Sequence, residues 1–131
     1  THPITGETQA AIDARAIQYQ ELFRYIEGEI TLNIYGTSTA KQVEDHDAVI
    51  ICGDFNSLTE TDKTTLKQLA TSYNYTMANG QYFGWMETAR NKAGTLKYSI
   101  DNIICSPGII INSVNVLVIV DKLLAQLIYP L

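Results

Sequence analysis

The feature that most constrains this chain is the apolar run Ala48–Cys52, which ends at Gly53 and Asp54. A short continuous apolar run rich in β-branched residues, bounded by polar residues or glycine, is typical of a strand that is buried on both faces. Such a strand needs other elements to cover it. We therefore expect a sheet with a buried strand at this position, and helices or a second sheet packed against it.

Two segments have the periodicity of amphipathic helices. From Ala11 to Glu27, apolar residues recur at steps of three and four, and Gly28 follows as a C-cap. After the apolar run, Thr59, Thr61 or a neighbouring residue can cap a second helix. The inner face of that helix would consist of Leu66, Leu69, Ala70 and Tyr73.

The remaining segments predict further strands and a last helix. The runs Lys97–Cys105 and Ile109–Val120 are joined by the turn signal at residues 106–108, which indicates an antiparallel pair. Leucines recur at helical spacing in Lys122–Leu131. The segment Glu29–Asp47 is compatible with a strand or with a continuation of the first helix, and Asn74–Thr95 indicates loops and short strands.

This order of elements predicts an α+β fold, with a mostly antiparallel sheet and helices on one of its faces. The opposite face would be apolar, and exposing it to water costs roughly 25 cal/mol for each square ångström. A second sheet from sequence outside this chain, or a second copy in a homodimer, would have to cover it. At 131 residues the chain is long enough for one domain and too short for two.

Composition excludes several classes of protein. An apolar share of 46% with 18% charged residues excludes a disordered chain, and no apolar stretch reaches the roughly 18 to 20 residues of a membrane-spanning helix. The net charge of −5 does not favour nonspecific binding to nucleic acid, although a bound metal can neutralise a local acidic site. Cys52 and Cys105 are expected to be buried free thiols, with a disulfide or a metal site as the alternative. The compartment stays open; the lack of a signal segment slightly favours the cytoplasm.

The chemistry of the chain centres on Gly53, Asp54, Phe55 and Asn56. In extended backbone, residues two apart point to the same side, so Asp54 and Asn56 would face one direction while Phe55 points into the core. A carboxylate and a carboxamide supply hard oxygen ligands for Mg²⁺ or Mn²⁺. An ordinary strand end with a turn is the alternative, because glycine, aspartate and asparagine are common in turns.

These residues also carry a resemblance to a known family. Residues 49–57, Val-Ile-Ile-Cys-Gly-Asp-Phe-Asn-Ser, resemble the hallmark strand of the endonuclease/exonuclease/phosphatase family, the DNase I-like metal-dependent phosphoesterases. The opening Thr1-His2 is similar to the family's Thr-His strand end, and a helix with Arg15 and Gln18 follows it. Residues 98–106, Tyr-Ser-Ile-Asp-Asn-Ile-Ile-Cys-Ser, look like the family's Ile-Asp-Tyr-Ile strand. Three elements in the right order cover nearly the whole chain.

The resemblance implies a role for each matching residue. Asp54 would orient the attacking water and, with Asn56, hold Mg²⁺ or Mn²⁺. Asn56 would also hold the scissile phosphate, and His2 would stabilise charge on the phosphoryl oxygens. Asp101 would accept a hydrogen bond from a catalytic histidine. The fold implied is a four-layer α/β/β/α sandwich, of which residues 1–131 would be an incomplete C-terminal portion.

The departures from the family pattern imply that this chain alone has little or no activity. The family's N-terminal Asn and metal-binding Glu would precede Thr1, and its closing Ser-Asp-His has no counterpart in Asp121–Leu131. Asn102 replaces the usual aromatic residue or histidine. A non-catalytic interaction module that keeps half of the fold is therefore the first alternative. A phosphate- or nucleotide-binding α/β domain with a coincidental Gly-Asp is the second, but it would need a glycine-rich loop that opens a helix, such as a P-loop, and the sequence has none.

The substrate class stays open between nucleic acids, nucleotides, inositol phosphates and lipid headgroups. The segment Gly80–Trp85 is rich in aromatic residues and is followed by Arg90, Lys92 and Lys97. It would line a substrate groove, or it would simply pack its aromatic rings onto the sheet.

Overall fold

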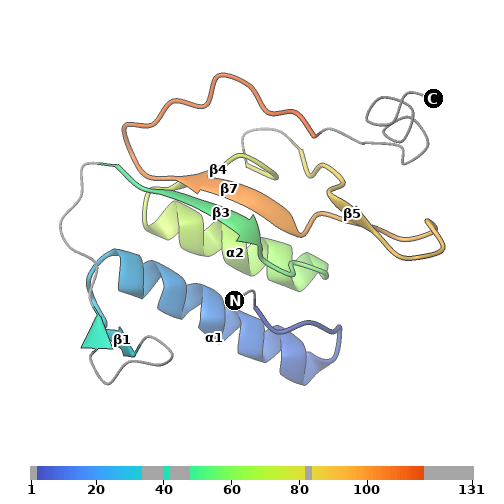
Figure 1. The fold of residues 1–131 in the computed structure, drawn as a ribbon, viewed down its shortest axis with the longest axis horizontal. Helices are drawn as coiled ribbons and strands as arrows, with labels where there is room; N and C mark the ends of the chain where they lie inside the picture. Colours follow the sequence, from blue (N-terminus) through green and yellow to red (C-terminus); the bar gives the residue numbers. More distant parts are fainter. Residues whose placement is uncertain (1–2, 34–39, 42–47, 82–83, 117–131) are drawn as a thin grey trace, which may run out of the picture.

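The computed structural model describes residues 3–33, 40–41, 48–81 and 84–116. They form an α+β fold in which a small antiparallel sheet lies against two helices (Figure 1), so the predicted fold class is confirmed. None of the described helices is both long and apolar enough to cross a membrane. The elements are, in chain order, α1 (Gln9–Ile26), β1 (Leu32–Asn33), β2 (Ala40–Lys41), β3 (Ile50–Asp54), α2 (Glu60–Ser72), β4 (Thr76–Met77), β5 (Ala89–Arg90), β6 (Lys97–Tyr98) and β7 (Asp101–Cys105).

Helix α1 begins and ends at residues whose local chemistry stops a helix. The Thr8 side chain accepts a hydrogen bond from the backbone N–H of Ala11 at 3.2 Å, as an N-cap does. At the other end Glu27 is the C-cap, and Gly28 takes the left-handed conformation with φ of 71°. The predicted first helix is confirmed, with the glycine one position beyond the cap.

Helix α2 is preceded by a capping box. The Thr59 side chain accepts from the backbone N–H of Asp62, and the Asp62 side chain accepts from the backbone N–H of Thr59 at 2.9 Å. Leu66 and Ala70 are completely buried on the inner face, while Leu69 is partly buried beside them. This confirms the predicted second helix and its apolar face.

The main sheet has the order β3-β7-β4, and both pairs of strands are antiparallel. Ile50 lies opposite Cys105 at one end of the β3–β7 pair, and Asp54 lies opposite Asp101 at the other. Two shorter antiparallel pairs, β1 with β2 and β5 with β6, lie outside this sheet. The two segments that the sequence singled out, residues 49–57 and 98–106, are therefore paired with each other as β3 and β7.

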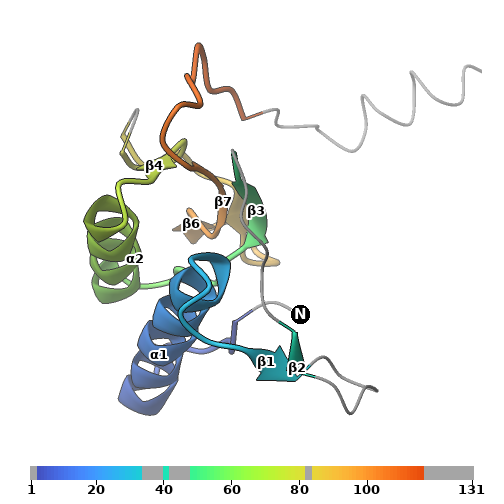
Figure 2. The ribbon, with the colours of Figure 1, turned by 90° about the vertical axis from the view of Figure 1, so that its left-hand side faces the viewer.

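The core lies between one face of the sheet and the two helices (Figure 2). Phe23 is at its centre; its ring stacks on Tyr73 with centroids 5.4 Å apart and meets the edge of Tyr75 at 5.6 Å. The buried core residues are Tyr19, Phe23, Ile26, Phe55, Leu66, Ala70, Tyr75, Met77 and Ile104.

The other face of the sheet, called the open face below, is only partly covered in the described part of the chain, where residues 114–116 lie beside Cys52 and Ile103. Ile50 is 62% exposed and Ile103 is 49% exposed, and Cys52 on the same face is exposed too. An exposed apolar surface, as expected, is therefore present at Ile50 and Ile103, although Cys105, which lies opposite Ile50 in the register, is buried. The strand at Ala48–Cys52 is therefore not buried on both faces, because the helices cover only one of them. The expectation of two buried thiols is correct for Cys105 and wrong for Cys52.

The predicted strand Lys97–Cys105 is divided into β6 and β7. The ladder is interrupted at Ile100, whose backbone N–H donates to the Thr88 side chain at 3.1 Å instead of to a neighbouring strand. The first part pairs with β5 and the second with β3. A side-chain acceptor from another loop cannot be foreseen from strand propensity.

The predicted strand Ile109–Val120 does not form over residues 109–116, and the rest of it lies outside the described residues. The turn before it is confirmed, with Gly108 at φ of 91° and the Ile109 N–H donating to the Ser106 carbonyl at 3.3 Å. The antiparallel partners of β7 are instead β3 and β4. The predicted helix in Lys122–Leu131 also lies outside the described residues.

Candidate functional site

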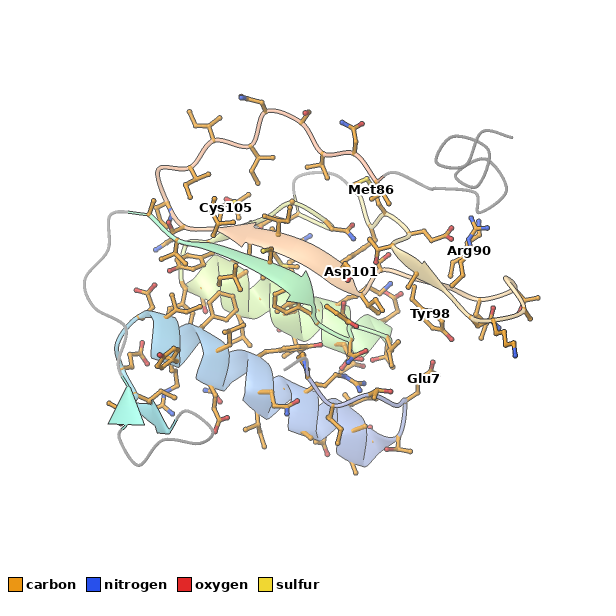
Figure 3. The ribbon with its side chains drawn as sticks, viewed as in Figure 1. Glu7, Met86, Arg90, Tyr98, Asp101 and Cys105 are labelled. Atoms are coloured by element: carbon orange, nitrogen blue, oxygen red, sulfur yellow. The ribbon has the colours of Figure 1, made fainter. Side chains whose placement is uncertain are left out.

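Asp54 and Asp101 lie directly opposite each other where β3 ends and β7 begins. Beyond them, the Phe55 N–H donates to the Ile100 carbonyl at 2.7 Å, so the two aspartates form a non-hydrogen-bonded pair, the type in which the two residues lie closer together. In such a pair the Cα atoms are about 4.5 Å apart and the side chains point to the same face. Asp101 is exposed and lies next to the β5–β6 hairpin (Figure 3). Two carboxylates so placed repel each other unless a cation or a proton lies near.

The chain turns sharply at the two residues after Asp54. Phe55 is 4% exposed and points into the core, as predicted. Asn56 has a φ of 48°, which asparagine tolerates better than most residues, and its backbone N–H donates to the Asp54 carboxylate at 2.7 Å. Extended backbone therefore ends at Phe55, and the expectation that strand alternation sets the direction of Asn56 is wrong.

The Asn56 side chain is held against the N-terminal segment. It is 6% exposed, and its Nδ2 donates to the carbonyl oxygen of Pro3 at 2.6 Å. Pro3, the residue that follows His2 in the sequence, therefore lies beside the site. His2 itself, predicted to contact the phosphate, lies outside the described residues.

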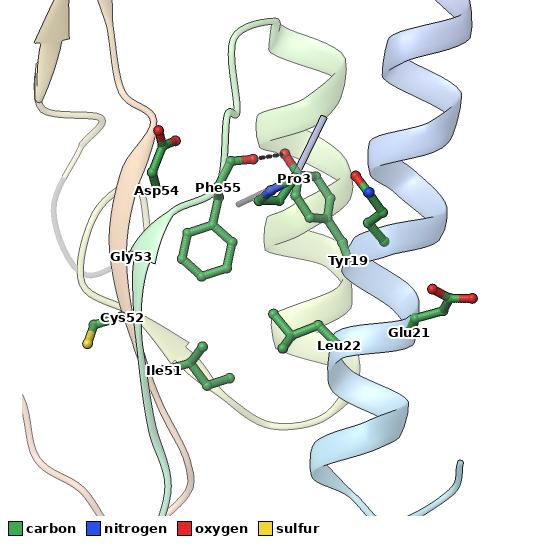
Figure 4. A pocket seen from close by; sticks show the side chains of 10 residues that line it. Pro3, Tyr19, Glu21, Leu22, Ile51, Cys52, Gly53, Asp54 and Phe55 are labelled. Carbon is green, nitrogen blue, oxygen red and sulfur yellow. Dashed lines mark hydrogen bonds between the residues drawn. The ribbon is translucent and has the colours of Figure 1, made fainter. Parts of the chain in front are cut away.

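Two hydroxyl groups fix the backbone of the same turn. The fully buried Tyr19 donates its O–H to the Phe55 carbonyl at 2.7 Å (Figure 4), and the Ser57 hydroxyl donates to the Ser99 carbonyl at 2.7 Å. Burial raises the pKa of Tyr19, and the negative charge of Asp62 raises it further. The phenol therefore stays protonated and remains a donor to the turn.

A buried ion pair lies beneath the site. Arg15 and Asp62 are 0% and 1% exposed. Arg15 donates two parallel hydrogen bonds to the Asp62 carboxylate, from Nε to Oδ1 at 2.9 Å and from Nη2 to Oδ2 at 2.8 Å. Arg15 Nη1 also donates to the carbonyls of Ile4 at 3.0 Å and Gly6 at 2.6 Å. Burial works to raise the pKa of Asp62, but hydrogen bonds from Arg15 and Thr59 outweigh it and hold that pKa below its usual value.

Two cavities adjoin the aspartates. One of about 560 Å³ lies between β3 and α1 (Figure 4), and its wall includes Asp54, Tyr19 and Leu22. The other, of about 280 Å³, lies on the open face of the sheet beside Asp101 and Ile103. Both have room for part of a small ligand next to a carboxylate.

The loop that precedes β5 is fastened to β7 by a pair of buried asparagines. The backbone N–H of Asn79 donates to Asn102 Oδ1 at 3.0 Å, and Asn102 Nδ2 donates to the Asn79 carbonyl at 2.8 Å. The Asn79 side chain also accepts from the Met86 N–H at 2.7 Å. Farther along this loop, the Thr88 hydroxyl accepts from the Asp101 N–H at 3.0 Å. These hydrogen bonds fix the backbone on either side of Asp101.

Residues 80–85 were expected either to line a substrate groove or to pack their aromatic rings onto the sheet. Trp85, the one aromatic residue among them that the structure describes, favours packing. Trp85 is partly buried against the core, and its indole covers Gly80; a Cβ at that glycine would come within 2.5 Å of the indole Cε2. Tyr82 and Phe83 lie outside the described residues. Arg90 and Lys97 both form ion pairs with Glu87.

The donor set fits a metal ion only in part. Asp54 and Asp101 supply carboxylate oxygens on one face, which suits a hard cation such as Mg²⁺. Among the residues that the structure describes, no group of three or more His, Cys, Asp or Glu side chains could hold a metal ion. A site here would need further ligands from elsewhere.

Sequence reasoning selected Asp54, Asn56 and Asp101, and the structure brings all three to one end of the β3–β7 pair. It missed the ion pair beneath them. Arg15 stands on the inner face of an amphipathic helix, and an arginine in that position signals a buried acidic partner. Asp62 was recognisable as the third residue of a capping box.

Comparison of the chain with protein-family models, with curated proteins and with solved structures gives no match.

Proposed function

We propose that this chain is the C-terminal portion of a metal-dependent phosphoesterase that resembles the endonuclease/exonuclease/phosphatase family. Such an enzyme hydrolyses a phosphoester bond by in-line attack of water on phosphorus. The substrate would be a nucleic acid, a nucleotide, an inositol phosphate or a lipid headgroup. The observation that carries the proposal is the direct opposition of Asp54 and Asp101, with Asn56 in the turn that follows.

The arrangement of these residues supports a division of labour. Asp54 can accept a proton from water, and its Oδ1 already holds the backbone N–H of Asn56, which keeps the carboxylate in place. An N–H of the Asn56 carboxamide would donate to a phosphoryl oxygen. A bound Mg²⁺ or Mn²⁺ would neutralise charge on the phosphate. Asp54 and Asn56, the ligands implied by the resemblance, would hold that ion.

Asp101 would not contact the reacting atoms and would act through another residue. Its carboxylate is exposed, and within the described residues it accepts no hydrogen bond. It is therefore available to orient a histidine, as the resemblance implies. None of the residues matched to the family takes the place of its catalytic histidine or its principal metal-binding glutamate. We therefore expect hydrolysis by this chain alone to stay near background.

Metal binding tests the proposal without requiring activity. We expect Mn²⁺ to broaden the NMR signals of Asp54, Phe55 and Asn56 selectively, with weak affinity of the order of 1 mM because few ligands are present. Asp54→Asn should abolish the selective broadening. The matched control Asp13→Asn removes an exposed carboxylate from α1 that accepts a hydrogen bond from Gln9, and should leave the broadening unchanged.

The outcomes separate three possibilities. Selective broadening with background hydrolysis of bis(4-nitrophenyl) phosphate supports an incomplete phosphoesterase. Hydrolysis that Asp54→Ala abolishes would overturn the expectation that the chain is inactive. If Mn²⁺ broadens no signals near Asp54, the metal site is wrong and the alternative, a non-catalytic interaction module, becomes the better explanation; the exposed Ile50 and Ile103 would then be its contact surface.

A further inference from the structure

Three polar side chains on one face of α1 point toward the site. Arg15, Gln18 and Tyr19 are three and four residues apart, which places them together along the helix. Tyr19 holds the Phe55 carbonyl directly, at 2.7 Å. The other two bind the N-terminal segment instead. Arg15 and Tyr19 are buried on the inner face of the helix, which is usually apolar, and Gln18 is exposed beside them, so these polar side chains need a separate explanation.

Gln18 and Arg15 bind both backbone groups of Ile4. Gln18 Oε1 accepts from the Ile4 N–H at 2.9 Å, and Arg15 Nη1 donates to the Ile4 carbonyl at 3.0 Å. The same guanidinium is fixed by its two hydrogen bonds to Asp62. We call residues 3–6 the N-terminal strap. In the described part of the chain no strand pairs with the strap, and these side chains hold it to α1 at Ile4.

The strap in turn determines how Asn56 is oriented. Its Pro3 carbonyl lies 2.6 Å from Asn56 Nδ2. A carbonyl oxygen can only accept, so the nitrogen end of the carboxamide must face Pro3 and the oxygen end must face elsewhere. Moving the strap would release this constraint on the carboxamide.

We propose that Gln18, Arg15 and Asp62 are positioning residues for Asn56: they hold the strap so that the Pro3 carbonyl fixes the orientation of the Asn56 carboxamide. The inference rests on the proposed function in that it gives Asn56 a task at the phosphate. The coupling itself is a property of the metal-free chain. Loss of any of the three side chains should therefore be felt at Asn56, although none of them is the residue that would contact substrate.

The test uses variants of Gln18, which is exposed, so that the fold survives. In Gln18→Ala, hydrogen exchange at the Ile4 amide should rise about two- to twelvefold, the loss expected for one hydrogen bond. The NMR signals of the Asn56 side-chain NH₂ should shift and broaden. Gln18→Glu keeps an acceptor and should restore both signals. Gln20→Ala, an exposed glutamine two residues away, is the control.

A double-mutant cycle gives the decisive readout. If the strap connects the two residues, the effects of Gln18→Ala and Asn56→Ala on the free energy of unfolding should be non-additive. The pair Gln20→Ala and Asn56→Ala should be additive. A purely structural Gln18 would destabilise the chain without shifting the Asn56 amide signals or coupling to Asn56.

Arg15→Lys extends the test to the ion pair, because lysine cannot form the two parallel bonds to Asp62. It should broaden the Asn56 amide signals further; if it unfolds the chain, the Gln18 variants decide. Unchanged Asn56 signals in Gln18→Ala, or an additive cycle, would overturn the proposal. All these measurements are made without metal, so a failed Mn²⁺ titration contradicts the proposed function and leaves the positioning role standing.

Discussion

At the scale of single residues, the buried Arg15–Asp62 pair is the most consequential contact in the described structure. Removing one partner leaves the other charge buried and uncompensated, which costs about 3–5 kcal/mol. We therefore expect Asp62→Asn to lower the free energy of unfolding by this amount at neutral pH. Urea denaturation would measure it. Glu60→Gln, which changes an exposed carboxylate in the same helical turn, should have almost no effect.

The same pair gives a pH dependence with a definite sign. The pKa of Asp62 is lower in the folded chain than its ordinary value of 3.8, so the unfolded chain takes up a proton first as the pH falls. The stabilisation is complete above that ordinary value and is lost as the pH drops through the lower folded pKa. Stability measured from pH 5 to pH 2 should therefore fall more steeply in the wild type than in Asp62→Asn. Equal slopes would show that Asp62 is not the titrating group.

At this scale, a residue could be predicted from the sequence only where a pattern of neighbouring residues marks it. Asp54 and Asp101 were selectable because a motif and a strand end mark them. The contact between Pro3 and Asn56 joins residues 53 positions apart through a backbone carbonyl, and a carbonyl has no sequence signature. The left-handed turn at Asn56 was missed because strand alternation was extended one residue too far.

At the scale of elements, α2 depends on the residue at its N-terminus. Thr59 satisfies a backbone N–H of the first turn and also donates its hydroxyl to the Asp62 carboxylate at 2.7 Å. Thr59→Ala should therefore cost about 1 kcal/mol, the usual price of losing an N-cap. Thermal unfolding followed by circular dichroism would measure it. Thr64→Ala, at an exposed position inside the same helix, should be neutral or slightly stabilising; a similar loss there would contradict the capping role.

The helices were predictable and the strands less so, for a physical reason. A helix forms all its hydrogen bonds within one segment, so caps such as Thr8 and Thr59 and a periodic apolar face suffice to locate it. A strand depends on a partner elsewhere in the chain. The β-branched residues 109–111 look as suitable for a strand as Ile50–Asp54, yet no ladder forms along them.

At the scale of the whole molecule, the prediction of helices on one face of an antiparallel sheet is confirmed. The four-layer sandwich remains a proposal, since the described residues supply one layer of strands and one of helices. What the sequence could not decide is what covers the open face. Apolar residues in strands look alike whether their partner is a helix, a second sheet or another chain.

The open face leads to a prediction about association. Ile50 and Ile103 are 62% and 49% exposed on neighbouring strands, an arrangement that monomers usually avoid. In a twofold dimer each contact occurs twice, and burying each isoleucine would contribute about 1 kcal/mol. We therefore expect light scattering to detect self-association that increases with concentration. Ile103→Lys should suppress it, because a lysine is costly to bury in an apolar interface. Ile17→Lys places the same charge on α1, away from the sheet, at a residue that is 57% exposed, and should leave association unchanged. Equal association of both variants would mean that the open face is not the contact.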